Sequence, residues 1–92
     1  MQNNSLIGIA WFDENDWEEW KKISDDEIED KYEDWLIEAT LVKSKYEAEG
    51  YMIKEVKITP DRFKIWCRKN NKKLDSSSRS EYVSELLQKS YS

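Results

Sequence analysis

Few side chains in this sequence could carry out catalysis. The chain contains no histidine, so serine or cysteine hydrolysis with a histidine base is excluded. Its single cysteine, Cys67, cannot form a zinc site alone. Its two glycines, Gly8 and Gly50, are too few for a glycine-rich phosphate loop. The sequence therefore predicts a non-catalytic protein without a cofactor or a metal.

Carboxylates are the remaining candidates for chemistry, because the chain has 20 Asp and Glu residues. Asp13, Asp16, Asp25 and Asp26 could supply oxygen ligands to calcium or magnesium, but their spacing matches no calcium-binding loop. Asp13 could also pair with Asp61 for hydrolysis if two parallel strands end side by side. Acids at helix starts are expected as caps without any ligand. A carboxylate-dependent enzyme or metal binder is therefore the last of three hypotheses.

The charge of the chain is divided between its two halves. Residues 1–50 hold 15 acidic and 5 basic residues, a net charge of −10, while residues 51–92 hold 5 and 10, a net charge of +5. Either the acidic half folds against the basic half and keeps the protein soluble, or its acidic surface binds a basic protein. The second interpretation is our leading hypothesis. It describes a small protein-interaction module, for example of the inhibitor, antitoxin or immunity type.

Two tryptophans lie inside the acidic half, on a short predicted helix. Either both rings pack onto the sheet, or one is partly exposed and anchors a basic partner, since tryptophan contributes much of the binding energy at protein interfaces. The candidate partner-binding residues are Trp17, Trp20, Glu18, Glu19, Asp25, Asp26 and Glu27.

The alternative hypothesis is a nucleic-acid-associated protein. Its candidate residues form a basic cluster close to Trp66, namely Arg68, Lys69, Lys72 and Lys73. The net charge of −5 argues against it, because binding to phosphates depends on neutralising their charge. Lysines near a helix C-terminus also complement the helix dipole without any ligand. Nucleic acid is therefore not the expected partner.

The cysteine content indicates a cytoplasmic protein. With Cys67 alone no internal disulfide can form, whereas small secreted domains usually depend on disulfides. The start of the chain, Met1 to Ser5, lacks the basic and apolar parts of a signal peptide. No stretch approaches the ~20 apolar residues of a membrane span, so no membrane partner is expected. Cys67 is expected on the apolar stripe of a helix, as a small buried hydrophobe.

Apolar periodicity places two strands and four helices. The first strand is apolar on both faces, which predicts an interior strand. The segment 25–29, with four carboxylates, is expected to be a solvated connection. Gly50 should end the longest helix, with Tyr51 packed back on Tyr46. The predicted elements are strand 5–12, helix 14–23, helix 32–49, strand 51–58, helix 60–70 and a helix from 78 to the C-terminal end.

Cap residues mark the predicted helix starts. Asp13 should cap the first helix, with Phe12 and Trp17 packed against each other across the cap. Capping-box patterns begin at Asp30 and Ser78, ahead of the second and fourth helices.

The order β-α-α-β-α-α predicts an α/β (α+β) fold. We expect one small domain over residues 1–92, with a disordered N-terminus at 1–4 and a frayed C-terminus at 90–92. Two strands alone make a poor sheet, so helices must cover its faces and its edges need neighbours. We therefore expect a homodimer whose sheet continues across the interface.

Three motifs resemble those of a known family. They are Gly-Ile-Ala-Trp-Phe at 8–12, Tyr-Glu-Asp-Trp-Leu at 32–36 and Trp-Cys-Arg at 66–68. In this order and at similar spacing they are similar to motifs of a family of uncharacterised bacterial proteins of comparable length, and the resemblance extends to Gly50 and Arg79. It implies a bacterial, intracellular, stand-alone domain. The family supplies no active site, so the resemblance implies no chemistry.

Overall fold

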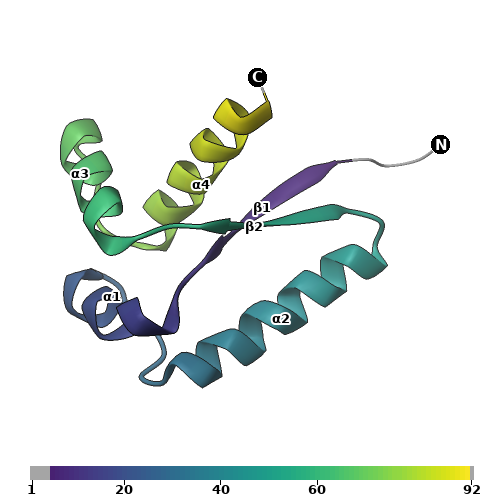
Figure 1. The fold of residues 1–92 in the computed structure, drawn as a ribbon, viewed down its shortest axis with the longest axis horizontal. Coiled ribbons are helices and arrows are strands. Elements are labelled where there is room, and N and C mark those ends of the chain that lie inside the picture. Colours follow the sequence, from purple (N-terminus) through teal and green to yellow (C-terminus); the bar gives the residue numbers. More distant parts are fainter. Residues whose placement is uncertain (1–4, 92) are drawn as a thin grey trace.

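A computed structural model describes residues 5–91 of the chain. Figure 1 shows one small domain with the predicted order β-α-α-β-α-α, so the α/β (α+β) prediction is confirmed. The elements are β1 (Leu6–Trp11), a 3₁₀ turn (Glu14–Asp16), α1 (Trp17–Ile23), α2 (Tyr32–Ala48), β2 (Met52–Lys57), α3 (Pro60–Asn70) and α4 (Ser76–Tyr91).

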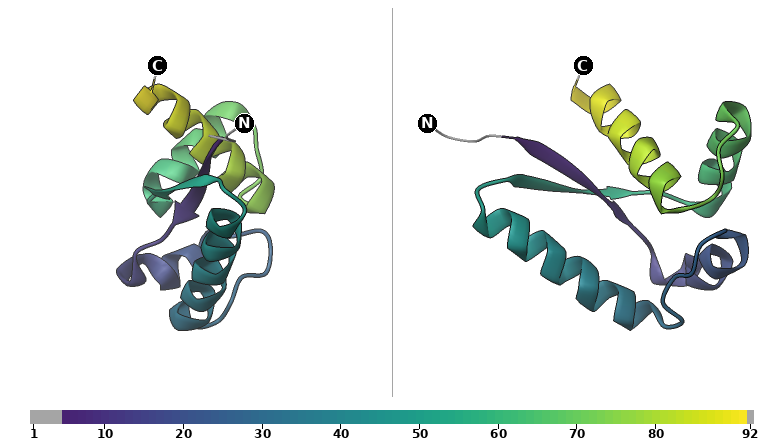
Figure 2. Two further views of the ribbon diagram at one scale, coloured as in Figure 1. Left: turned by 90° about the vertical axis from the view of Figure 1, so that its right-hand side faces the viewer. Right: turned by 180° about the vertical axis from the view of Figure 1, so that it is seen from behind.

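The two strands pair in parallel, with Leu6 opposite Met52 and Trp11 opposite Lys57. Helix α2 packs on one face of this sheet and α4 crosses the other (Figure 1, Figure 2). Helices α1 and α3 lie at the end where both strands finish. Gly8 brings α4 close to β1, because a Cβ atom there would lie 2.9 Å from Cγ1 of Val83.

The core is rich in aromatic rings and lies where the strands end. Phe12 follows β1 directly, and its ring centroid is 4.8 Å from that of Trp20. Trp20 in turn lies 5.6 Å from Phe63 of α3, centroid to centroid. Both Trp20 and Phe63 are fully buried, at 1% and 0% exposed. Such ring pairs add to the burial energy that a chain this small needs.

Several local predictions are confirmed. The Asp13 carboxylate accepts a hydrogen bond from the backbone N–H of Asn15 at 2.9 Å, at the start of the 3₁₀ turn that leads into α1. Gly50 follows α2 with a positive φ of 98°, the backbone conformation that glycine favours. The rings of Tyr46 and Tyr51 meet edge to face at 5.7 Å across this turn.

Both capping-box predictions are wrong. Before α2 no side chain caps the helix, and the Asp30 carboxylate instead accepts a hydrogen bond from Nζ of Lys21 at 3.1 Å. Helix α4 begins at Ser76 rather than at Ser78, because the Asp75 carboxylate accepts from the backbone N–H of Ser78 at 3.0 Å. Before α2, the Lys21 ammonium takes the carboxylate that the pattern assigned to the cap. Before α4, the Asp75 carboxylate caps the helix in place of the Ser78 hydroxyl.

Strand β1 is not the interior strand that its apolar composition predicts. The sheet has two strands within residues 5–91, so β1 is an edge strand. The sheet is also too narrow to cover the whole of α2. As a result Val42 and Tyr46, both on the predicted apolar stripe, are 44% and 36% exposed.

The two predicted chain ends lie partly or wholly outside residues 5–91. The segment 1–4, expected to be disordered, lies outside the described residues, as does Ser92. Helix α4 runs through Tyr91, within the segment 90–92 that we expected to be frayed. Over residues 5–91, the helices lack the length and apolar character that crossing a membrane requires.

Candidate functional site

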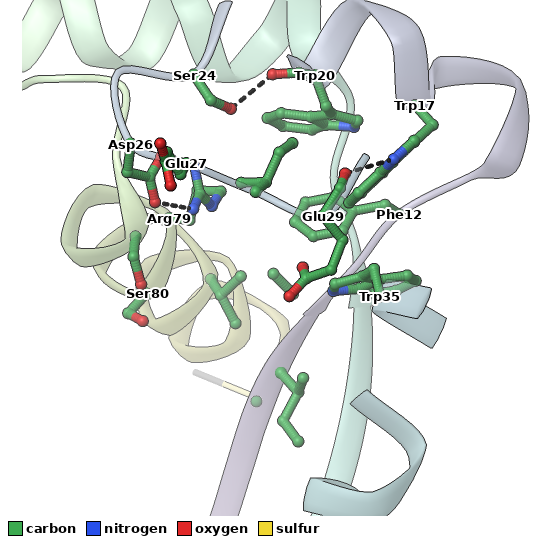
Figure 3. Close-up of a pocket in the computed structure, with 16 residues that line it drawn as sticks. Phe12, Trp17, Trp20, Ser24, Asp26, Glu27, Glu29, Trp35, Arg79 and Ser80 are labelled. Atoms are coloured by element: carbon green, nitrogen blue, oxygen red, sulfur yellow. Dashed lines mark hydrogen bonds and ion pairs between the residues drawn. The ribbon is translucent and has the colours of Figure 1, made fainter. Parts of the chain in front are cut away.

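The strongest candidate site is a cavity of about 390 Å³ beside β1. It lies between α1, the connection 24–29 and the first half of α4, and Figure 3 shows its lining side chains. Its volume is within the range of about 300–1,000 Å³ that ligand pockets occupy. Aromatic rings form its wall, and three of the four charged residues that line it are acidic.

Four aromatic rings form the wall, namely those of Phe12, Trp17, Trp20 and Trp35. Phe12 is the central ring, with centroids 4.8 Å from Trp35 and 5.7 Å from Trp17. The contact with Trp17 is the predicted packing across the Asp13 cap. Because the rings come from the residue after β1, from α1 and from α2, the wall exists only in the folded chain.

Hydrogen bonds fix the orientation of this wall. The Trp17 indole N–H donates to the backbone carbonyl of Glu29 at 3.1 Å. The Tyr32 hydroxyl donates to the carbonyl of Phe12 at 3.0 Å, and burial raises the pKa of Tyr32, so the phenol remains a neutral donor. The Trp20 indole N–H is buried and has no hydrogen-bond partner among the described residues. Such an unsatisfied donor typically costs about 1–3 kcal/mol of stability.

An ion pair joins the two sides of the cavity. The Arg79 guanidinium of α4 donates to both carboxylate oxygens of Asp26, at 3.1 and 2.6 Å (Figure 3). The Arg79 side chain is 11% exposed and that of Asp26 is 28% exposed. This bidentate geometry is the strong form of an arginine–carboxylate contact. Glu27 and Glu29 also line the cavity, and neither carboxylate forms an ion pair with a basic side chain of residues 5–91.

The acidic connection is exposed at Asp25 and Glu27, as predicted for a solvated segment, but it is also anchored. The backbone N–H of Asp25 donates to the carbonyl of Leu74 at 2.7 Å, and the Asp25 carboxylate accepts from the N–H of Leu74 at 2.8 Å. Ile28 packs against the core. The connection is therefore a built wall of the cavity, held by residues about half a chain away.

The structure brings four of the seven predicted partner-binding residues to the cavity. Trp17 and Trp20 belong to its wall and Asp26 and Glu27 to its rim. Both tryptophans pack inside, at 3% and 1% exposed, so the first of our two interpretations of these rings holds and neither is an exposed anchor.

The other three predicted residues, all acidic, lie outside the cavity. Glu18 pairs with Lys21 at 3.2 Å and Glu19 with Lys64 at 3.6 Å, while Asp25 makes the contacts to Leu74 described above.

Several lining residues were not predicted. Trp35 appears in the sequence analysis only within the Tyr-Glu-Asp-Trp-Leu motif, and Glu29 only among the four carboxylates of the segment 25–29. Arg79 is one of three arginines in the chain, and no local pattern links it to Asp26, which lies 53 positions away.

Comparison with protein-family models, curated proteins and solved structures found no match. The family resemblance of the three motifs therefore stays a prediction.

The basic cluster lies elsewhere, at the end of α3 and after it. Arg68, Lys69 and Lys73 are exposed, while Lys72 pairs with Glu81 of α4 at 3.2 Å. Trp66 donates from its indole N–H to the Glu85 carboxylate at 2.6 Å. Acidic side chains of α4 therefore border the cluster and reduce its positive charge.

The remaining candidates for chemistry occupy structural positions. Cys67 is buried, 1% exposed, and burial raises the pKa of its thiol, which disfavours the reactive thiolate. Asp13 caps the 3₁₀ turn, and Asp26 is paired with Arg79. Within residues 5–91, acidic and cysteine side chains do not gather in threes as a metal site requires.

Proposed function

We propose that this protein is a non-catalytic protein-interaction module whose acidic N-terminal half binds a basic protein. The observation that carries the proposal is the cavity, whose lining includes the partly exposed ring of Trp35 and the carboxylates of Glu27 and Glu29. Aromatic faces and carboxylates both attract ammonium and guanidinium groups. The free thiol of Cys67 supports a reducing compartment such as the cytoplasm.

The acidic half keeps a negative surface after folding. Asp26 and Glu19 pair with basic residues of the second half, through Arg79 and Lys64. Other acidic residues remain exposed, among them Glu27, Glu33, Asp34, Glu38, Glu47 and Glu49. Folding therefore neutralises part of the −10 charge of residues 1–50 and leaves the rest available to a cation.

An affinity experiment tests this function. The immobilised full-length chain should capture basic proteins from a bacterial lysate at low ionic strength and release them as salt is raised. The variant Glu27→Gln/Glu29→Gln should capture less of them. Glu47→Gln/Glu49→Gln, which removes the same charge at the far end of α2, should capture as much as the wild type. Equal losses in both variants, or no captured protein, would refute the proposal.

The same experiment separates the nucleic-acid alternative. If the cluster of Arg68, Lys69, Lys72 and Lys73 were the binding surface, the captured material would be nucleic acid, and nuclease treatment would remove it. The pairing of Lys72 with Glu81 favours the protein partner.

The homodimer stays a prediction that rests on the free edges of the two-stranded sheet. Light scattering at micromolar concentration measures it directly. A monomer mass would remove it without affecting the acidic interaction surface.

A further inference from the structure

The cavity lies along the free edge of β1. The carbonyl of Ser5 accepts a hydrogen bond from the N–H of Met52 in β2, and the carbonyl of Trp11 accepts one from Ile58, which follows β2. Peptide groups alternate in direction along a strand, so the odd-numbered residues of β1 face β2. The even-numbered residues therefore direct their N–H and C=O groups to the other side, where the sheet has no further strand within residues 5–91.

Two of these even-numbered residues, Gly8 and Ala10, line the cavity. Their outward N–H and C=O groups border a space of about 390 Å³. A strand advances roughly 3.3 Å per residue, so a few residues of extended chain would run past both positions. The cavity therefore lies where a third strand would pair with β1.

The sequence of β1 also lacks the residues that usually protect an edge strand. Natural edge strands carry charges, prolines or bulges that prevent pairing with another chain. Residues 6–11 read Leu-Ile-Gly-Ile-Ala-Trp, without a charge or a proline, whereas β2 carries Lys54, Glu55 and Lys57. An unprotected edge beside a lined cavity indicates that a bound segment covers it.

We infer that the cavity receives an extended, basic segment of a protein partner, which adds to β1 as a third strand. The inference rests on the proposed function and names the form of the ligand. The backbone of the segment pairs with Gly8 and Ala10. Side chains on one face of the segment lie toward α4, with Val83 and the paired Arg79. Alternate side chains lie toward Trp35 and Glu29, where a lysine or arginine finds both an aromatic face and a carboxylate.

Charge distinguishes this occupant from a second copy of the chain. The β1 strand of a second copy brings no cation to Glu27 and Glu29, and each copy carries a net charge of −5. A basic segment neutralises the rim, whereas a second copy adds to its repulsion. A partner strand with a basic residue at every second position therefore fits the cavity best.

Synthetic peptides test the inference on the full-length chain. The probe is a capped hexapeptide of alternating lysine and valine, with binding followed by tryptophan fluorescence and calorimetry. It should bind at least tenfold more tightly than the hexapeptide of alternating glutamate and valine. Methylating the amide nitrogens along one edge of the peptide should abolish binding, while methylating the other edge should preserve it, because one edge pairs with β1.

Variants of the chain locate the binding edge. Ala10→Pro removes an outward N–H that β2 does not use, so it should block the edge and weaken the lysine–valine peptide at least tenfold. Glu29→Gln should weaken it several-fold, and Glu47→Gln should leave it unchanged. If Ala10→Pro does not fold, as judged by circular dichroism, the two methylated peptides still decide the question.

The outcomes separate the inference from the function on which it rests. If the chain captures basic proteins but both methylated peptides bind equally, the interaction function stands and strand addition is overturned. If the chain is a dimer that Ala10→Pro makes monomeric, a second copy occupies the edge and the inference is overturned. If neither proteins nor peptides bind, both proposals fail.

Discussion

The contact between α4 and β1 predicts the effect of a single methyl group. In Gly8→Ala the new Cβ would lie 2.9 Å from Cγ1 of Val83 and 3.1 Å from Cδ2 of Leu87. Overpacking of this kind costs about 1–3 kcal/mol. Replacing glycine by alanine returns about 0.4–1 kcal/mol through the unfolded chain. We therefore expect the free energy of unfolding to fall by about 1–2 kcal/mol.

Urea denaturation followed by tryptophan fluorescence measures this change. The midpoint should fall while the m-value stays constant, because the surface exposed on unfolding does not change. The midpoint of thermal unfolding should fall by about 4–8 °C for each kcal/mol of unfolding free energy that is lost.

A suppressor separates steric overlap from a general effect of the substitution. Val83→Ala should itself destabilise, because Val83 is buried, but in combination with Gly8→Ala it removes the nearest clashing atom. The double variant should therefore be more stable than the sum of the single variants predicts, by about 1 kcal/mol.

Gly50→Ala is the matched control for this suppression. Its φ is 98° and no atom lies within 4 Å of the added methyl, so it destabilises through the backbone and should show no coupling to Val83→Ala. Strict additivity of Gly8→Ala and Val83→Ala would refute the steric argument.

Three further predictions concern the ion pair, the thiol and the cap of α4. Arg79→Ala should lower the free energy of unfolding by about 1–3 kcal/mol, because it leaves the partly buried Asp26 unpaired. A double-mutant cycle with Asp26→Ala should give a favourable coupling, and a coupling of zero would contradict the pair. A thiol reagent at pH 8 should modify Cys67 only as fast as the chain unfolds, because the thiol is buried and its pKa is raised. Rapid modification of the native protein would contradict this. The hydrogen bond from the Ser78 N–H lowers the pKa of the Asp75 carboxyl below its ordinary value of 3.8. The ionised carboxylate therefore stabilises the fold above pH 3.8, and this stabilisation is lost as the pH falls through the lowered pKa. Asp75→Asn should therefore flatten the acid side of the stability–pH curve, and an unchanged curve would contradict the role of the cap.

The sequence predicts the order of elements because that order depends on local signals. Asp13, Gly50 and the Tyr46–Tyr51 contact involve residues at most five apart, and each behaves as predicted. The capping boxes at Asp30 and Ser78 fail although they are local too. There the pattern allows two hydrogen-bonding solutions, and contacts with other side chains select one.

The candidate site was only partly predictable because its decisive contacts are long-range. Nothing within the connection 25–29 shows that Asp25 binds Leu74 and that Asp26 pairs with Arg79, about 50 positions away. Acidic composition alone suggests a solvated loop. The three carboxylates that line the cavity, those of Asp26, Glu27 and Glu29, all lie in the acidic half that the charge division marks. The edge position of β1 depends on strand number, which apolar composition does not fix.

The parallel register also determines the order in which the protein can be completed during synthesis. Leu6 pairs with Met52, so β1 leaves the ribosome long before its neighbour exists. During that interval the uncharged, apolar segment of β1 is accessible to other nascent chains and to chaperones. Slow translation between the two strands should therefore increase aggregation of the newly made protein.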